Sequence, residues 1–354
     1  MKDITVLSSA CGAFFMPGFF MCLKENNERN IRIVGCDLSE DSVMMKLFVD
    51  EYYQVPAYTA INYVDVLLDI CRRENVDVFF PHISMEMPYI LERISDFEAI
   101  GVKVAISEKE TLVTANNKYK LYEYMKKVGL VVPQYFLVDS VETLRKRIYE
   151  LGYPAKPVCV KMTENSGSRG VRIVRADVNK SYLFIHDKPS SLNVTLDEMC
   201  EILEQCNPMP EIIAMEYLPG VEYTIDLLAD HGKVLYIAGR RNTTSSMSIA
   251  QSSVVEHKES AYRICEDIVR ELNLDGNIGF DFMLDDDDNP WLTDLNPRVT
   301  ATIILYAGAG LNFPYLRVKQ LLGEKLPNIK LKYGTKLIRK YWDVLYNENG
   351  RINL

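Results

Sequence analysis

Two carboxylates and an amide in the last third of the chain have the residue types and spacing of a divalent-cation site. Asp281 lies in one apolar run, and Asp294 and Asn296 lie in the next, beyond the acidic turn Asp285–Asp288. This pattern predicts a β-hairpin. Because side chains two apart on a strand share a face, Asp294 and Asn296 point the same way, and Asp281 can stand opposite them. Such oxygens suit Mg²⁺, which is usually held together with substrate phosphates; the alternative is a hairpin whose polar residues face water.

A lysine at the end of an apolar run, followed by a loop of small residues, is a second candidate site. The strand predicted at Cys159–Met162 carries Lys161. Glycines let backbone N–H groups approach anionic oxygens, and a nearby lysine or arginine adds positive charge. The pattern therefore indicates phosphate binding, although the spacing of a P-loop is absent and an ordinary turn is the alternative. The loop residues concerned are Ser166, Gly167, Ser168, Arg169 and Gly170.

A third segment places carboxylates on both sides of a Pro-Gly break. Glu216, Tyr217 and Leu218 precede Pro219-Gly220, and Glu222 follows it. Taken alone, this segment predicts no more than a strand, a turn and a second strand.

Taken in this order, the three segments resemble the ATP-grasp superfamily, and in particular the ligases that are similar to the large subunit of carbamoyl-phosphate synthase. The resemblance covers about Lys118 to Leu326, and the preceding residues look like the family's N-terminal α/β domain. The hairpin carries the most specific match: an acidic residue is followed, thirteen positions later, by the acid of an acid–x–Asn–Pro–Arg element ending at Arg298.

The resemblance implies a role for each matched residue. It implies that Lys118 and Lys161 contact phosphates and that the loop Ser166–Gly170 closes over them. It further implies that Glu216, with the backbone of Tyr217 and Leu218, binds adenine, and that Glu222 binds the ribose. Asp281, Asp294 and Asn296 would bind Mg²⁺, or alternatively Mn²⁺. Arg298 would lie near the transferred phosphoryl group, and either Arg240 or Arg241 would face the γ-phosphate.

The implied activity is that of an ATP-dependent carbon–nitrogen ligase, which joins a small-molecule carboxylate to an amine through an acylphosphate. A small-molecule kinase and a non-catalytic nucleotide-binding regulator are the alternatives. The chain departs from the family at Asn117, where relatives have Asp, and at Asp294, where Glu is more frequent. After Arg298 it reads Val-Thr-Ala-Thr instead of a Gly-rich turn, which weakens any inference about the substrate.

The elements before these motifs alternate between strand and helix patterns, as in an open parallel sheet. Ligands of such sheets lie beyond the carboxyl ends of the strands. Glu86, which follows one of these strands, could bind an amino group or simply begin a helix. Asp37 also ends a strand, but the absence of GxGxxG argues against a dinucleotide, and we interpret His82 as structural. The predicted strands are Ile4–Ser8, Ile31–Cys36, Val76–Phe80 and Val102–Ile106.

We therefore predict an α/β protein with an open parallel sheet in an N-terminal Rossmann-like domain, followed by a split ATP-grasp fold of α+β type. The predicted boundaries are 1–110 for the first domain and 111–326 for the ATP-grasp domain, with a small lid at about 131–217 and a tail at 327–354. Further helices are expected at Val64–Glu74, Lys118–Val128, Leu196–Cys206 and Ser260–Leu272. Further strands are expected at Val171–Val174, Ile212–Glu216, Val221–Leu228, Val234–Gly239, Ile278–Leu284 and Trp291–Asn296.

Composition narrows the class of protein. The 354 residues carry a formal net charge of −9 with scattered basic residues, which disfavours a nucleic-acid partner. The eight cysteines include no CxxC pair, so we expect no zinc site and a reducing compartment. The apolar run Ala10–Leu23 is too short for a membrane span and contains Pro17-Gly18. We expect a cytoplasmic protein that needs no membrane, and the resemblance is compatible with a homodimer.

Overall fold

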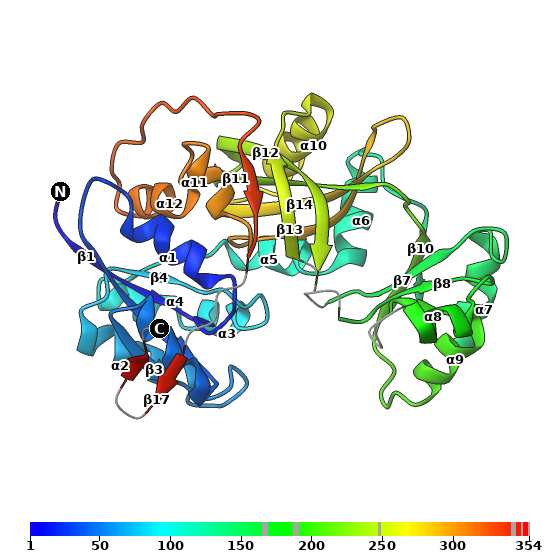
Figure 1. The fold of residues 1–354 in the computed structure, drawn as a ribbon, viewed down its shortest axis with the longest axis horizontal. Helices are drawn as coiled ribbons and strands as arrows, with labels where there is room; N and C mark the ends of the chain where they lie inside the picture. The colour runs from blue at the N-terminus through cyan, green and yellow to red at the C-terminus, as the bar shows by residue number, and fades with distance from the viewer. Residues whose placement is uncertain (165–168, 187–190, 247–248, 341–344, 348–349, 353–354) are drawn as a thin grey trace.

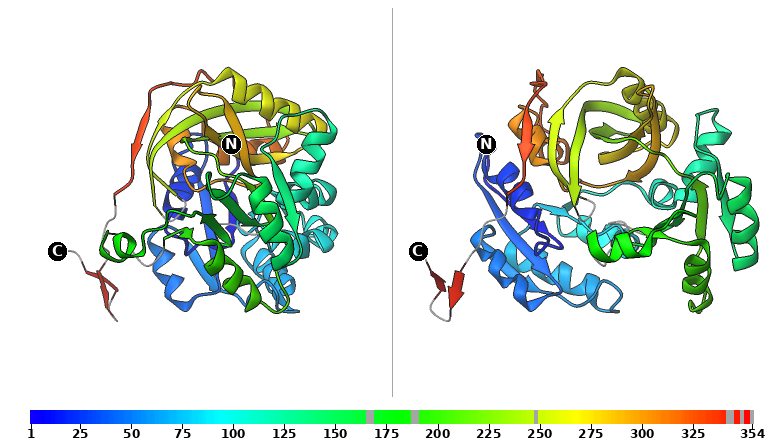
Figure 2. Two further views of the ribbon diagram at one scale, coloured as in Figure 1. Left: turned by 90° about the vertical axis from the view of Figure 1, so that its right-hand side faces the viewer. Right: turned by 45° about the vertical axis from the view of Figure 1, so that its right-hand side comes forward.

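Three β-sheets make up most of the molecule (Figure 1). The computed structural model describes residues 1–354 except 165–168, 187–190, 247–248, 341–344, 348–349 and 353–354. Figure 2 shows a strongly curved central sheet, with the N-terminal sheet on one side of it and a small sheet on the other. None of the helices in the described ranges is long and apolar enough to cross a membrane.

The N-terminal sheet is parallel, in the strand order β3-β2-β1-β4-β5, as the alternating pattern predicts. Its strands are rich in apolar residues because helices cover the sheet. The strands are β1 (Ile4–Ser8), β2 (Ile31–Asp37), β3 (Glu51–Gln54), β4 (Val78–Phe80) and β5 (Lys103–Val104). The helices are α1 (Met16–Lys24), the 3₁₀ helix η1 (Glu40–Leu47), α2 (Tyr63–Glu74), α3 (Met87–Glu92) and α4 (Ile94–Ala99).

The small sheet, which we call the lid, has the strand order β6-β10-β7-β8-β9. Two helices, α5 (Lys109–Ala115) and α6 (Lys118–Lys127), lead into it. One of its helices, α9, starts with a capping box in which the Thr195 and Glu198 side chains each bind the other's backbone N–H. The lid consists of β6 (Tyr135–Val138), α7 (Val141–Glu150), β7 (Val158–Met162), β8 (Val171–Val174), α8 (Lys180–His186), β9 (Asn193–Val194), α9 (Leu196–Glu204) and β10 (Ile212–Glu216).

The large sheet has the order β15-β14-β11-β12-β13-β16. Its strands are β11 (Val221–Asp230), β12 (Lys233–Ser246), β13 (Ile249–Val255), β14 (Gly276–Leu284), β15 (Pro290–Asn296) and β16 (Lys336–Ile338). The amphipathic helix α10 (Glu259–Glu271) packs on β11 and β12. Three strands of this sheet differ most from expectation: β12 is longer than predicted, β13 is not among the predicted strands, and β16, from the segment expected to be a tail, pairs with β13. A separate hairpin, β17 (Leu345–Asn347) and β18 (Gly350–Ile352), follows.

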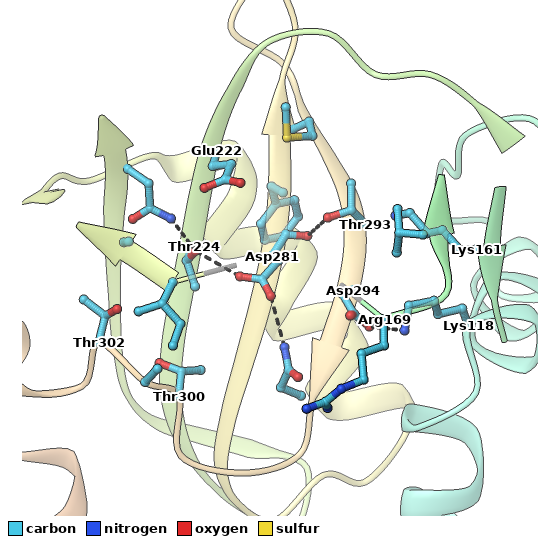
Figure 3. Close-up of a pocket in the computed structure, with 18 of the residues that line it drawn as sticks. Lys118, Lys161, Arg169, Glu222, Thr224, Asp281, Thr293, Asp294, Thr300 and Thr302 are labelled. Carbon is cyan, nitrogen blue, oxygen red and sulfur yellow. Dashed lines mark hydrogen bonds and ion pairs between the residues drawn. The ribbon is translucent and has the colours of Figure 1, made fainter. Parts of the chain in front are cut away.

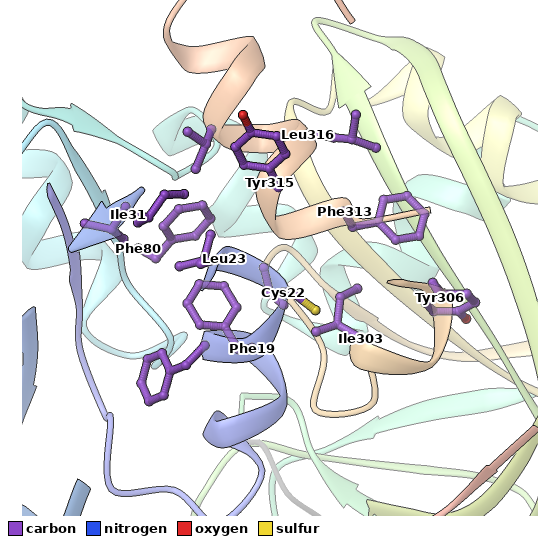
Figure 4. Packing of buried hydrophobic residues seen from close by; sticks show 14 of the residues in the cluster. Phe19, Cys22, Leu23, Ile31, Phe80, Ile303, Tyr306, Phe313, Tyr315 and Leu316 are labelled. Carbon is purple, nitrogen blue, oxygen red and sulfur yellow. The ribbon is translucent and has the colours of Figure 1, made fainter. Parts of the chain in front are cut away.

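One apolar core joins the N-terminal sheet to the large sheet (Figure 4). Helix α1 contributes Phe19, Cys22 and Leu23 to this core. Its partners include Tyr306 of α11 (Ile304–Gly308) and Phe313 of α12 (Phe313–Leu321). Because these side chains are almost fully buried, the hydrophobic effect holds the two sheets in one arrangement. This packing places the carboxyl ends of β1 and β4 beside the loop that follows β15.

Candidate active site

A cavity of about 700 Å³ lies where the three sheets meet. Its walls come from the loops after β1 and β4, from the lid strands β7, β8 and β10, and from β11 to β15 of the large sheet. Figure 3 shows charged and polar side chains that converge on it from different elements. Cavities of this size at the junction of domains are typical ligand sites.

The hairpin carboxylates meet in this cavity in the predicted arrangement. Asp281 of β14 stands opposite Asp294 of β15, and the Asn296 amide donates a 3.0 Å hydrogen bond to Oδ2 of Asp281. The Thr224 hydroxyl of β11 donates to the other oxygen of Asp281 at 2.9 Å. A bulge between Asp281 and Phe282 interrupts the strand pairing beside the carboxylates.

The electrostatics of the hairpin favour a cation. Burial and then the nearby charge of Asp294 raise the pKa of Asp281 to about 6. Two facing carboxylates are destabilised by desolvation and mutual repulsion, and a divalent cation relieves both effects. The donor set of two carboxylates and an amide is that of a hard cation such as Mg²⁺, so the residues fit the predicted metal.

Positive side chains face these acids from the lid and from α6. Lys118, at the start of α6, forms a 3.2 Å salt bridge with Asp294. Lys161 lines the cavity from β7 and forms no salt bridge with any residue that the structure describes. Arg169 also lines the cavity, and Gly170 accepts a hydrogen bond from the Met162 backbone. The predicted phosphate residues Ser166, Gly167 and Ser168 lie outside the described residues.

The far end of the cavity is a largely apolar slot. Cys159, Ile173 and Met215 of the lid line it together with Phe282 and Met283 of β14. A flat, apolar ring system such as a purine base suits a slot of this composition. The predicted adenine and ribose residues, Glu216, Tyr217, Leu218 and Glu222, all line the same end. Glu222 accepts a hydrogen bond from Ser245.

The three candidate arginines lie in different environments. Arg298 lines the cavity and donates a 3.2 Å hydrogen bond to the Ser84 hydroxyl; it forms no salt bridge within the described ranges, although Asp294, Asp281 and Asp226 lie near enough to act on its charge. Arg240 lines the cavity too, but Asp226 neutralises its charge. Arg241 is on the opposite face of β12, where it pairs with Glu256 and Asp288. A direct role for Arg241 at the γ-phosphate is therefore wrong, because strand alternation turns its side chain away.

The prediction of Glu86 as a substrate ligand is also wrong. This carboxylate is fully buried and lies outside the cavity lining. Its oxygens accept hydrogen bonds from the hydroxyls of Ser9 and Tyr63 and from the backbone N–H groups of His82 and Ile83. Glu86 therefore ties the end of β1 to the loop after β4, and it has no free oxygen to offer an amino group.

Several residues of the cavity are not among the predicted site residues, and two of these have unpaired polar atoms. Thr300 is not singled out by any sequence pattern, and His82 is expected to be structural, yet both line the cavity. Each also has a buried side-chain atom, His82 Nε2 and Thr300 Oγ1, without a hydrogen-bond partner in the described structure. For Thr300, the signal in the sequence is the departure from the family pattern after Arg298.

Comparison with known proteins agrees with this geometry. A family model described as "ATP-grasp in the biosynthetic pathway with Ter operon" matches residues 208–340, and one described as "PylC-like, N-terminal domain" matches residues 19–105. Over residues 208–340 the chain thus matches an ATP-grasp family model, and its sequence and fold are similar to those of ATP-grasp proteins.

Individual relatives are distant in sequence. The arginine-specific large chain of carbamoyl phosphate synthase from Halalkalibacterium halodurans is 20% identical over 79% of this chain, which covers 26% of that relative. Formate-dependent phosphoribosylglycinamide formyltransferase from Anaeromyxobacter dehalogenans is 25% identical over 80% of this chain and 72% of its own length. The chain thus spans only about a quarter of the carbamoyl phosphate synthase large chain.

Two solved structures establish the likeness in fold. N5-carboxyaminoimidazole synthetase from Staphylococcus aureus, complexed with ADP, superposes with a TM-score of 0.66 at 15% identity, over 94% of this chain and 81% of that one. An L-amino acid ligase from Bacillus licheniformis gives 0.61 at 16% identity, over 91% and 74% of the two chains.

Proposed function

We propose that this protein is an ATP- and Mg²⁺-dependent ligase that activates a small carboxylate as an acylphosphate and transfers the acyl group to an amine. The observation that carries the proposal is the position of Arg298. This guanidinium has no carboxylate partner among the described residues, and it lies in the same cavity as Lys161 and the acidic hairpin. A substrate anion at Arg298 would therefore face the phosphate end of a nucleotide bound in the apolar slot.

The reaction would proceed in two steps. A carboxylate oxygen of the substrate attacks the γ-phosphorus of ATP, the bond to the β–γ bridging oxygen breaks, and ADP leaves. The amine then attacks the acyl carbon, the C–O bond to phosphate breaks with its electron pair on phosphate, and the amine nitrogen loses a proton. Such a reaction requires positioning and charge neutralisation rather than a covalent protein nucleophile.

Each charged residue has a place in this scheme. Lys118, Lys161 and Arg169 would bind the phosphates, and Arg298 would orient the attacking carboxylate and bind the oxygens that become negative. Asp281, Asp294 and Asn296 would hold Mg²⁺, which supplies neutralisation of the phosphate charge when bound. Glu216 and Glu222 would contact the adenine and ribose. We assign residues 111–326 to the ATP-binding unit, and we place the protein in the cytoplasm.

Trapping with hydroxylamine tests this function. The protein is incubated with ATP, Mg²⁺ and a panel of carboxylates, and both ADP and hydroxamate are measured. We expect one carboxylate to give both products in equal amounts. Formation of ADP and a phosphorylated product without hydroxamate would instead establish a kinase. Nucleotide binding without turnover on any panel member would contradict the ligase and favour a regulator.

A matched pair of variants links the activity to the hairpin. Asp294→Ala removes a proposed metal ligand, whereas Asp286→Ala removes an exposed carboxylate from the turn of the same hairpin. Hydroxamate formation should be lost only in the first variant. Equal activity in the two variants would contradict the assignment of the metal ligands.

A further inference from the structure

The cavity extends beyond the hairpin into a region that the proposed nucleotide residues do not line. We call this region the acceptor wall; it consists of cavity-lining residues from the ranges 10–15, 82–84, 249–250 and 298–302. In Figure 3, Thr300 and Thr302 lie across Asp281 from Lys118 and Lys161. A substrate that is activated by ATP must contact this wall.

The acceptor wall carries positive charge and no negative charge. Arg298 is the cation of this wall, and no described residue of the wall is acidic. The acidic residues that line the described cavity are Glu216 and Glu222 at the nucleotide end and Asp281 and Asp294 in the hairpin. A substrate carboxylate therefore finds a counter-ion on this wall, whereas a substrate ammonium finds none.

The two nearby acids of the N-terminal sheet do not change this balance. Asp37 accepts hydrogen bonds from the backbone N–H groups of Gly12 and Ser39, at 2.9 and 3.0 Å. Glu86 is buried behind Ser9 and Tyr63, as described above. The other acids near Arg298 are Asp281 and Asp294, which are the proposed metal ligands, and Asp226, which pairs with Arg240. Because burying an ammonium without a counter-charge costs roughly several kcal/mol, a cationic group is disfavoured on this wall.

Two polar atoms of the acceptor wall lack partners. The buried Nε2 of His82 and Oγ1 of Thr300 have no hydrogen bond in the described structure. The His82 ring packs edge-on against Phe19, and burial lowers its pKa to about 3, so the imidazole is neutral at physiological pH. A Cβ on Gly279 would lie 2.2 Å from the Thr300 methyl carbon, so this glycine provides the space for Thr300. Buried polar atoms of this kind normally have a partner.

We propose that the carboxylate activated by this protein is a small hydroxy or oxo acid without an ammonium group. Its carboxylate binds Arg298, and its neutral oxygen substituent hydrogen-bonds to His82 and Thr300. This inference rests on the proposed ligase function for the activation step, but it also makes a statement about binding that is independent of turnover.

Matched pairs of acids provide the test. Binding is measured by calorimetry with the full chain, Mg²⁺ and a non-hydrolysable ATP analogue. The pairs share a carbon skeleton: lactate with alanine, glycerate with serine, and malate with aspartate, with pyruvate as the oxo acid. For at least one skeleton we expect the hydroxy or oxo acid to bind at least about tenfold more tightly than the amino acid. Equal or tighter binding of every amino acid, or no binding of any acid, would overturn the inference.

A conservative variant locates the contact. Thr300→Val keeps the shape beside Gly279 and removes the hydroxyl. It should weaken binding of the preferred hydroxy or oxo acid about tenfold, since one hydrogen bond is lost, and it should leave nucleotide affinity unchanged. Thr335→Val, remote from the cavity lining, is the control and should change neither. Unchanged acid binding by Thr300→Val would remove Thr300 from the site.

The ligase assay separates failure of this inference from failure of the function. A hydroxy acid that binds as expected but forms no hydroxamate would support the substrate class and contradict the ligase. A hydroxamate formed from an amino acid in preference to its hydroxy counterpart would support the ligase and overturn the substrate class.

Discussion

The two ends of the cavity are built differently. At the nucleotide end, charges of both signs face one another: Lys118 pairs with Asp294, and Lys161 stands near the acidic hairpin. On the acceptor wall, Arg298 forms no salt bridge with a described residue, the other polar residues of the wall are neutral, and the nearest carboxylates are those of the hairpin and Asp226. A nucleotide with a bound metal ion presents charges of both signs, whereas the acceptor wall suits an anion. The difference supports the proposed placement of the nucleotide and of the acid substrate.

The two ends of the cavity also differ in the elements that carry their side chains. Most residues of the nucleotide end lie on strands, where the backbone hydrogen bonds of a sheet hold them in place; the exceptions are Lys118 at the start of α6 and the loop residues Arg169, Tyr217 and Leu218. Those of the acceptor wall come largely from the segments that follow β1, β4 and β15, and the packing of α1 against α11 and α12 brings these segments together. Strand-borne groups suit a fixed ligand such as ATP, and loops are where substrate preference most readily varies.

The strongest test of this difference is Asp294→Ala. Loss of this carboxylate should reduce turnover by about 10²–10³-fold, because the site would lose one of the proposed ligands of the metal ion that would neutralise phosphate charge. Most of the nucleotide affinity should remain, since the apolar slot and Lys161 are unchanged. Steady-state turnover and nucleotide binding are measured on the same preparation. Wild-type turnover with Mg²⁺ would contradict the assignment of the hairpin as the metal site.

Arg298→Lys tests the acceptor side. Lysine keeps the charge but loses the planar fork that binds a carboxylate through two parallel hydrogen bonds. We expect turnover to fall about 100-fold with little change in ATP binding. The control is Arg241→Lys, because Arg241 is charged but pairs with Glu256 away from the cavity. Similar losses of turnover in the two variants would argue against a special role for Arg298.

Lys161→Ala should have a smaller effect, confined to the nucleotide end. Loss of one charge-assisted hydrogen bond to phosphate should raise the apparent KM for ATP about tenfold. The affinity for the carboxylate should be unchanged. Initial rates measured across ATP concentrations, at saturating carboxylate, show the shift. An unchanged ATP dependence would exclude Lys161 from phosphate binding.

The sequence predicted the relative positions of the hairpin residues, which the strand pairing of the structure reproduces. The spacing of Asp294 and Asn296 follows from strand alternation, and the apolar runs around Asp281 mark the partner strand. The choice between Arg240 and Arg241 could not be made, because it depends on the pairing of Thr224 with Arg240 across β11 and β12.

Long-range contacts explain the remaining differences. Glu86 has the local pattern of a ligand at the end of a strand, but residues 9 and 63 satisfy its oxygens. The importance of Thr300 depends on Gly279, which lies on another strand. Neither contact is encoded in a local periodicity, so only the folded structure shows it.

The smallest expected effect is on the stability of the metal-free protein, and it distinguishes the two ends of the cavity without an activity assay. Because the pKa of Asp281 is raised to about 6, the ionised carboxylate destabilises the metal-free fold above that pH. Asp281→Asn should therefore stabilise the metal-free protein by about 1–3 kcal/mol at pH 8. The gain should shrink at pH 5, where the wild-type carboxyl group is mostly protonated.

Thr300→Val on the acceptor wall is the control. It removes no charge, so its effect on stability should not change between these pH values. Thermal unfolding in the presence of a chelator measures both variants, and a pH-independent gain for Asp281→Asn would show that the facing carboxylates do not repel each other as the structure indicates.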